Sequence, residues 1–181
     1  MLRIQKLPKA ILYAAKAHDT QLRRGREPYV MHSLRVMQNV MLFNVGEYVA
    51  IAAVLHDVVE DTDTTQKELE SEFGFGATEL VKQLTKTEEN KDNYLENILK
   101  SENFELILIK FLDIYDNLQE DEGDETFYKL VLHSKWEDSY KRYVKNAYQL
   151  KKELIKLASK YNYTEIVNLL NFRFQLPPEP L

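Results

Sequence analysis

Long stretches without a helix-breaking residue are the feature that most constrains the fold of this chain. Its 181 residues include only five glycines and five prolines, and no segment shows a sustained alternation of apolar and polar residues. Half-buried strands need that alternation, whereas apolar residues three and four positions apart in uninterrupted segments favour helices. The sequence therefore predicts an all-α protein, folded as one helical bundle.

The expected helices follow from apolar spacing and from their end signals. They span residues 10–18, 31–43, 47–61, 65–73, 76–84, 93–100 and 104–118. Pro8 fits the first turn of the first helix, and Thr65 to Glu68 has the pattern of a capping box. Gly74 would end the helix that this box begins. The helix at 47–61 is apolar nearly all round, which indicates a position at the centre of the bundle.

The C-terminal part is expected to differ from the rest. Gly123 and its acidic neighbours predict a loop that leaves the main bundle. Beyond it a heptad seam runs through Trp136, Tyr140, Tyr143, Ala147, Leu150, Leu154 and Leu157. A long helix packing on its own bundle gives this pattern more often, but the seam is also compatible with a homo-oligomer. We expect one domain over residues 1–181, with a motif-bearing bundle at about 8–120, C-terminal helices at about 124–174 and a free tail at 175–181.

Charge and residue types restrict the classes of function. The net charge is −5, whereas proteins that bind nucleic acid usually present a basic face to phosphates. The chain has no cysteine for a disulfide or a metal, and its first residues lack the apolar core of a secretory signal. No apolar run is long enough for a membrane span. We expect a soluble, cytoplasmic protein that binds neither nucleic acid nor membrane.

The clearest basic cluster consists of Arg23, Arg24 and Arg26. Three arginines within four positions suit one small anionic ligand better than a duplex. On this observation alone, a solvated loop is the favoured interpretation.

The stretch LHDVVEDTDTT, residues 55–65, carries the strongest chemical signal. In a helix, His56 lies one turn from Glu60 and Asp57 lies one turn from Asp61, directly after turns that are almost purely apolar. Burying so much charge is costly unless a cation compensates it, and imidazole and carboxylate both bind divalent metals. For an isolated His-Asp dipeptide, a helix end whose acids face water is the better interpretation.

Two further positions favour a metal site. His32 opens the second helix, and Asp113 is an acid within the apolar helix at 104–118. Taken alone, Asp113 could pair with Lys110, and a histidine such as His32 is more often a satisfied core residue than a ligand. The order of His32, His56–Asp57 and Asp113 along the chain is what indicates a shared site.

That order resembles the HD phosphohydrolase superfamily, and more closely the hydrolase domain of RelA/SpoT-type proteins and their small single-domain relatives. Four blocks carry the resemblance: AHDTQLRRGREPYVMHS at 17–33, HDVVEDT at 56–62, the FG and TK pairs at 73–74 and 85–86, and IKFLDIYDN at 109–117. Each block alone is a weak signal, but four in the family's order and spacing are a strong one.

The resemblance implies a function and a role for each site residue. Such enzymes remove the 3′-pyrophosphate of guanosine tetra- and pentaphosphate, the alarmones of the stringent response. It implies that His32, His56, Asp57 and Asp113 hold one metal, manganese, and that Glu60 and Asp61 activate the attacking water. Arg23, Arg24 and Asn117 would then contact the nucleotide, while His18 is assigned a structural role.

Departures from the family's pattern keep three functions open. They fall at Thr20, Arg26, Ser33, Leu112, Asp116 and Gln119, where no metal ligand is expected. The first function is alarmone 3′-pyrophosphohydrolase, and the second is the same metal chemistry on another phosphate, such as the 2′-phosphate of NADPH. The third is a regulatory domain that senses a nucleotide without hydrolysing it, against which the intact Glu60–Asp61 pair argues.

Overall fold

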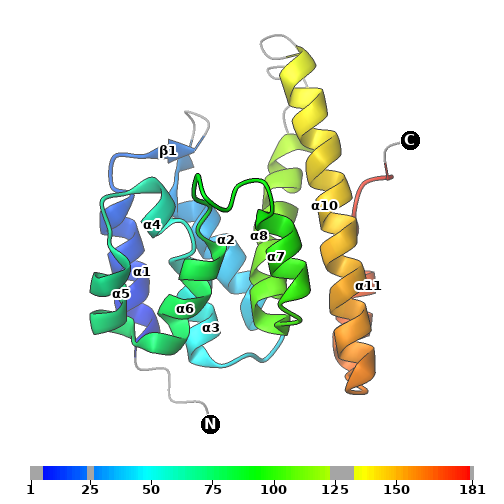
Figure 1. Ribbon diagram of the computed structural model, residues 1–181, viewed down its shortest axis with the longest axis horizontal. Helices are drawn as coiled ribbons and strands as arrows, with labels where there is room; N and C mark the ends of the chain where they lie inside the picture. The colour runs from blue at the N-terminus through cyan, green and yellow to red at the C-terminus, as the bar shows by residue number, and fades with distance from the viewer. Residues whose placement is uncertain (1–5, 24–26, 123–132, 180–181) are drawn as a thin grey trace. The chain divides into compact units, whose positions relative to one another are not determined.

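The computed structural model describes residues 6–23, 27–122 and 133–179, with the backbone alone at 120–122 and 133–137. Almost all of its regular structure is helical, so the expected all-α fold is confirmed (Figure 1). The chain divides into two compact units, unit 1 at residues 1–100 and unit 2 at 101–181, and each is described here by itself. The expected single domain stays a prediction.

In its described residues, unit 1 contains helices and one short two-stranded ladder. Its elements are α1 (Leu7–Ala17), β1 (Leu22–Arg23), β2 (Glu27–Pro28), α2 (Val30–Met41), α3 (Glu47–Val54), α4 (Val58–Asp61), α5 (Gln66–Phe73), α6 (Phe75–Leu84) and α7 (Tyr94–Lys100). The ladder is antiparallel and pairs Leu22 with Pro28. It includes Arg23, for which the basic cluster alone favours a solvated loop, and it lies between α1 and α2.

Helix α3 is the core of unit 1. It contacts α1, α2 and α6, and all of its last six residues, Val49–Val54, are buried. A helix that is apolar on every face is stable only when neighbours cover all of it. The expected central position of this helix is therefore confirmed.

The expected continuous helix at 47–61 is wrong, because the chain turns at Leu55–Asp57 between α3 and α4. In a continuous helix the carbonyl of Ala53 would accept from the backbone N–H of Asp57. Here that carbonyl lies 2.8 Å from the ring Nδ1 of His56. The backbone N–H of Val58 bonds to Leu55 three residues back, which tightens the turn. The His-Asp dipeptide thus lies in a turn and not on a helix face.

Three predicted helix-end signals are confirmed. The side chain of Thr65 accepts from the backbone of Glu68 while the Glu68 carboxylate accepts from the backbone of Thr65, which is a complete capping box. Gly74 follows α5 with a φ of +88°, a value that suits glycine, and α6 begins at the next residue. Pro8 lies in the first turn of α1, as expected.

Unit 2 consists of α8 (Phe104–Glu122), α10 (His133–Lys160) and α11 (Thr164–Phe172). Helix α10 packs against both α8 and α11, and the seam residues Ala147, Leu150 and Leu154 are fully buried in the single chain. The central seam therefore packs inside the chain, and the homo-oligomer stays a prediction. The expected loop at Gly123 falls largely outside the described residues, although α8 runs four residues past its expected end at Leu118.

The described part of the C-terminal tail is hydrogen-bonded to unit 2 through Gln175 and Pro177. The Tyr148 hydroxyl donates to the carbonyl of Pro177 at 3.0 Å, so the expectation of a free tail is wrong there. Along the described ranges, no helix is both long enough and apolar enough to cross a membrane.

Candidate metal centre

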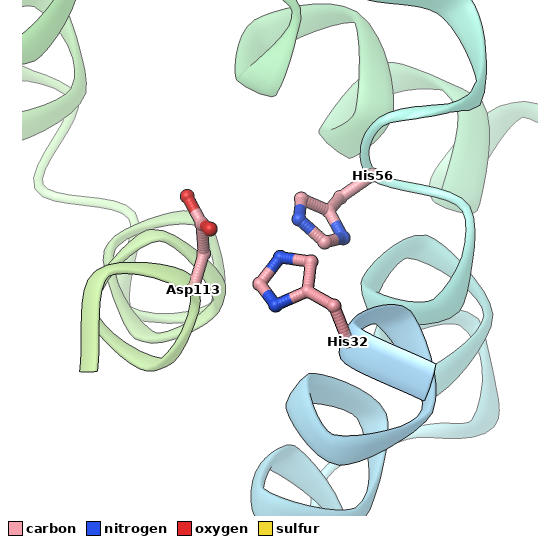
Figure 2. Close-up of side chains that lie close together, drawn as sticks. All are labelled: His32, His56 and Asp113. Carbon is pink, nitrogen blue, oxygen red and sulfur yellow. The ribbon is translucent and has the colours of Figure 1, made fainter. Parts of the chain in front are cut away.

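The first half of the candidate site is a pair of buried histidines in unit 1. His32 lies in the first turn of α2 and is fully buried, and His56, in the turn after α3, is 3% exposed. Their ring centroids are 5.2 Å apart at an interplanar angle of 62°. Figure 2 shows the two imidazoles turned toward each other from their separate elements. Two titratable rings in a protein core need a polar partner to offset their desolvation.

The carboxylate of Asp57 is a polar partner of both imidazoles. Its Oδ2 oxygen lies 3.0 Å from Nε2 of His56 and 3.7 Å from Nε2 of His32. The side chain of Asp57 is 20% exposed. Within unit 1 the structure therefore brings together three of the four expected ligands, with both histidines close to one oxygen of Asp57.

The hydrogen bond of His56 to Ala53 shows that this arrangement fits a cation. A carbonyl only accepts, so Nδ1 of His56 carries the hydrogen, and in the neutral ring Nε2 then presents a lone pair. A lone pair 3.0 Å from a carboxylate oxygen is unfavourable unless positive charge lies there. A second ring proton or a metal ion supplies that charge. Imidazole nitrogen and carboxylate oxygen together suit divalent zinc, manganese and iron.

Tyr29 binds the same carboxylate, a role that the sequence analysis missed. Its hydroxyl donates to Oδ2 of Asp57 at 2.7 Å. Burial, and after it the negative charge of Asp57, raise the pKa of the Tyr29 phenol above its usual value, so the hydroxyl stays protonated and donates. The available signal was the Pro-Tyr pair of the first block, three residues before His32.

The two expected catalytic acids lie at the end of helix α4. The Glu60 carboxylate accepts from the backbone N–H of Lys86 at 2.8 Å, which ties α4 to the Thr85–Lys86 pair of the family's pattern. Asp61 borders an open pocket of about 650 Å³ in unit 1. Its lining is mostly polar: Tyr13, Ala17, Thr20, Gln21, Asp61, Thr62, Asp63, Thr64 and Glu68. Both acids are exposed to solvent, as a group that binds water must be.

Of the expected substrate-binding arginines, the structure describes one. Arg23 is 9% exposed, and its guanidinium carbon lies 5.3 Å from the centroid of the Tyr29 ring. Arg24 lies outside the described residues. His18 is 2% exposed and stacks on Tyr29 at 4.7 Å between ring centroids, in keeping with the structural role assigned to it.

The remaining expected ligand, Asp113, belongs to α8 of unit 2 (Figure 2). Lys110 donates to its Oδ2 at 2.7 Å, so the ion pair considered from the sequence is present. Asn117, expected to contact substrate, donates from Nδ2 to Oδ1 of Asp113 and to its backbone carbonyl, each at 2.9 Å. The amide of Asn117 therefore holds the carboxylate of Asp113, whatever else it contacts.

The buried histidines, the His-Asp turn and the helical surroundings define a class of protein. Residues 10–106 match the HD domain family, and the chain belongs to it. A divalent metal is what this family implies, and His32, His56 and Asp113 each offer an atom that can bind one.

Particular relatives narrow the comparison. The chain is 34% identical over 122 residues to a guanosine-3′,5′-bis(diphosphate) 3′-pyrophosphohydrolase of Aquifex aeolicus, covering 64% of this chain and 18% of that protein. It is 32% identical over 127 residues to the bifunctional (p)ppGpp synthase/hydrolase SpoT of Escherichia coli, covering 65% and 18%. This chain thus spans less than a fifth of the length of these relatives.

Solved structures cover more of the chain. One is described as a metazoan ortholog of SpoT that hydrolyses ppGpp and plays a role in starvation responses. It has a TM-score of 0.69 at 28% identity and covers 89% of this chain and 98% of that one. A second, lmo0812 from Listeria monocytogenes, has a TM-score of 0.60 at 25% identity. The resemblance to RelA/SpoT-type hydrolases, stated from the four sequence blocks, is confirmed.

Proposed function

We propose that this chain is a metal-dependent phosphohydrolase that converts guanosine 3′,5′-bis(diphosphate) to GDP and pyrophosphate. The observation that carries the proposal is the placement of two imidazole nitrogens, from His32 and His56, beside one carboxylate oxygen of Asp57. This arrangement calls for a cation. The names of the relatives supply the substrate, since a ppGpp hydrolase matches almost its whole length to this chain. A cytoplasmic location belongs to the same proposal.

The metal in this proposal is manganese, held by His32, His56, Asp57 and Asp113. Two neutral imidazoles and two carboxylates offset the charge of a divalent ion, and this mixed donor set suits manganese. Asp113 occupies the last ligand position of the family's pattern, and its carboxylate is oriented by Lys110 and Asn117. When bound, the metal supplies Lewis acidity to the phosphoryl group.

Glu60 and Asp61 orient the attacking water and take its proton in this proposal. The bond between the ribose 3′ oxygen and phosphorus breaks, the water oxygen joins phosphorus, and the 3′ oxygen takes up a proton. The hydrogen bond from Lys86 to Glu60 supports this role because it fixes the direction of an exposed carboxylate. A general base must be held within reach of the water that it deprotonates.

Arg23, Arg24 and Asn117 bind the nucleotide in this proposal. A guanidinium plane can stack on a purine while its N–H groups bind phosphate. The contact of Arg23 with the Tyr29 ring holds its guanidinium in a fixed orientation beside the segment that leads to His32.

A nucleotide panel tests the proposal. Metal-stripped protein is incubated with Mn²⁺ and with guanosine tetraphosphate, GTP, ATP or NADPH, and the products are separated and identified. We expect GDP and pyrophosphate from guanosine tetraphosphate alone. Release of phosphate from NADPH while guanosine tetraphosphate survives would overturn the substrate but leave the metal centre, and no turnover with any of them would favour a nucleotide-sensing domain.

Arginine variants test the substrate contacts. Arg23→Ala and Arg24→Ala should raise KM more than they lower kcat, because a contact made equally in the ground and transition states is lost. Arg142→Ala is the matched control, since Arg142 also lies over a tyrosine ring, at 6.0 Å, but in unit 2. An unchanged KM in both variants would remove the arginines from the substrate site.

A further inference from the structure

Tyr29 contacts His18 and three of the expected site residues, His32, Arg23 and Asp57. Its ring stacks on His18 at 4.7 Å, meets the edge of His32 at 5.9 Å between centroids, and lies 5.3 Å from the guanidinium carbon of Arg23. Only its hydroxyl reaches Asp57, which is 28 residues further along the chain. The ring and the hydroxyl of Tyr29 thus make separate contacts, and a substitution can remove the hydroxyl oxygen while keeping the contacts of the ring.

The hydroxyl contact acts on one oxygen of Asp57. The same Oδ2 that accepts from Tyr29 at 2.7 Å faces Nε2 of His56 and Nε2 of His32. A hydrogen bond from a hydroxyl to a carboxylate is short and strong because the acceptor is charged. It therefore restricts rotation of the carboxylate about the Cβ–Cγ bond, and with it the direction of the oxygen nearest both histidines.

The hydrogen bond from Tyr29 reaches an aspartate that lies in a turn and not within a helix. Asp57 lies in the turn between α3 and α4, makes no side-chain capping bond to α4, and is partly exposed. A ligand on a turn loses rotational freedom when a metal binds, and a fixed partner removes part of that loss beforehand.

We propose that Tyr29 is a positioning residue of the metal centre: its hydroxyl holds the carboxylate of Asp57 in the direction from which it binds the metal. This role rests on the metal-binding part of the proposed function and extends it to a residue outside the expected set of ligands. His18 supports the role by stacking on the ring of Tyr29, and its Nδ1 donates to Oε1 of Gln21 at 2.7 Å.

Tyr29→Phe tests the role because it removes the hydroxyl and keeps the ring contacts with His18, His32 and Arg23. Tyr148→Phe is the matched control, since it removes a hydroxyl that donates to a backbone carbonyl in unit 2. Metal-stripped proteins are titrated with Mn²⁺ in a calorimeter, with no nucleotide present. We expect Tyr29→Phe to bind Mn²⁺ about 10- to 100-fold more weakly, the usual effect of losing a partner of a metal ligand. Tyr148→Phe should bind as the wild type does.

A second measurement separates positioning from general damage to the fold. In the Tyr29→Phe variant the Mn²⁺ concentration for half-maximal activity should rise by a similar factor, and saturating Mn²⁺ should restore most of kcat with KM unchanged. Equal Mn²⁺ affinity in Tyr29→Phe and wild type overturns the role of Tyr29 alone. A wild type that binds no divalent ion overturns both this role and the metal centre. Weaker Mn²⁺ binding by Tyr29→Phe, with no nucleotide hydrolysed, supports the role and overturns only the proposed reaction.

Discussion

Asp57 in unit 1 and Asp113 in unit 2 are both buried or half-buried acids of the proposed centre, yet their carboxylates are held differently. Asp113 is bound by Lys110 and Asn117, which lie three residues before and four residues after it on the same helix. Asp57 is bound by Tyr29, which lies 28 residues earlier in the chain. The first arrangement follows from helix periodicity, whereas the second exists only after α2 and the 55–57 turn have packed.

This difference indicates which part of the proposed centre is more easily disturbed by substitution. Contacts between residues three or four apart persist as long as their helix is formed. A contact across 28 residues is lost as soon as either segment moves. We therefore expect substitutions in unit 1 to affect metal binding more than comparable substitutions in unit 2.

The largest expected effect comes from removing the carboxylate of unit 1. Asp57→Ala should strip the metal and reduce hydrolysis to the background of the assay, because the oxygen facing both histidines is gone. His56→Ala should do the same. Elemental analysis measures the metal and far-UV circular dichroism the helix content, which should stay near wild type.

The control for these variants is Asp92→Ala, which removes an exposed acid of unit 1 outside any helix. It should retain both metal and activity. A metal content in Asp57→Ala and His56→Ala equal to that of the wild type would show that these residues are not ligands.

The next largest effect on activity is expected from removing a proposed general base that is not a metal ligand. Glu60→Gln keeps an oxygen that can accept from Lys86 but removes the carboxylate's basicity. We expect kcat to fall about 10²- to 10⁴-fold with Mn²⁺ affinity unchanged. Asp61→Asn should behave alike, and the exposed Glu88→Gln should not. Loss of Mn²⁺ with near-normal turnover after re-addition would instead make these acids supports of the metal.

A smaller effect is expected in unit 2. Asn117→Ala removes the amide that donates to Oδ1 of Asp113, while Lys110 still binds Oδ2. We expect Mn²⁺ affinity to fall by about tenfold, less than after Asp57→Ala, together with a higher KM for the nucleotide. If only KM changes, Asn117 contributes to nucleotide binding, and Mn²⁺ affinity does not depend on its hydrogen bond to Asp113.

The smallest effect should come from a local contact away from the centre. Thr65→Ala removes the capping box of α5 and should lower the free energy of unfolding by about 1 kcal/mol. Thermal unfolding measures this loss, and Mn²⁺ affinity should not change. A large drop in Mn²⁺ affinity would mean that α5 helps to hold α4 in place, and unit 1 would then be fragile beyond its long-range contacts.

Much of the fold was predictable from sequence because its signals are local. The capping box at Thr65, the glycine at the end of α5 and the proline in α1 each act within one helical turn. The same holds for the Lys110–Asp113 pair, which lies three residues apart.

What could not be predicted depends on contacts between segments. The turn at Leu55–Asp57 arises where His56 bonds the carbonyl of Ala53, although every residue from 47 to 61 suits a helix. The contact of Tyr29 with Asp57 joins a loop to a turn, and no periodicity links them. Arg23 looked like a residue of a solvated loop, yet the two-residue ladder and the Tyr29 ring bury it.

His56 lies in the turn directly after α3, and the last six residues of that helix are all buried. Because protein interiors are close-packed, His56 cannot shift by a few tenths of an ångström without displacing neighbours of α3 on every side. The position of the imidazole of His56 is therefore restricted by its packing. In the proposed metal centre, the bond of an ill-fitting ion to this nitrogen would be strained, so the packing of unit 1 would favour ions of one size.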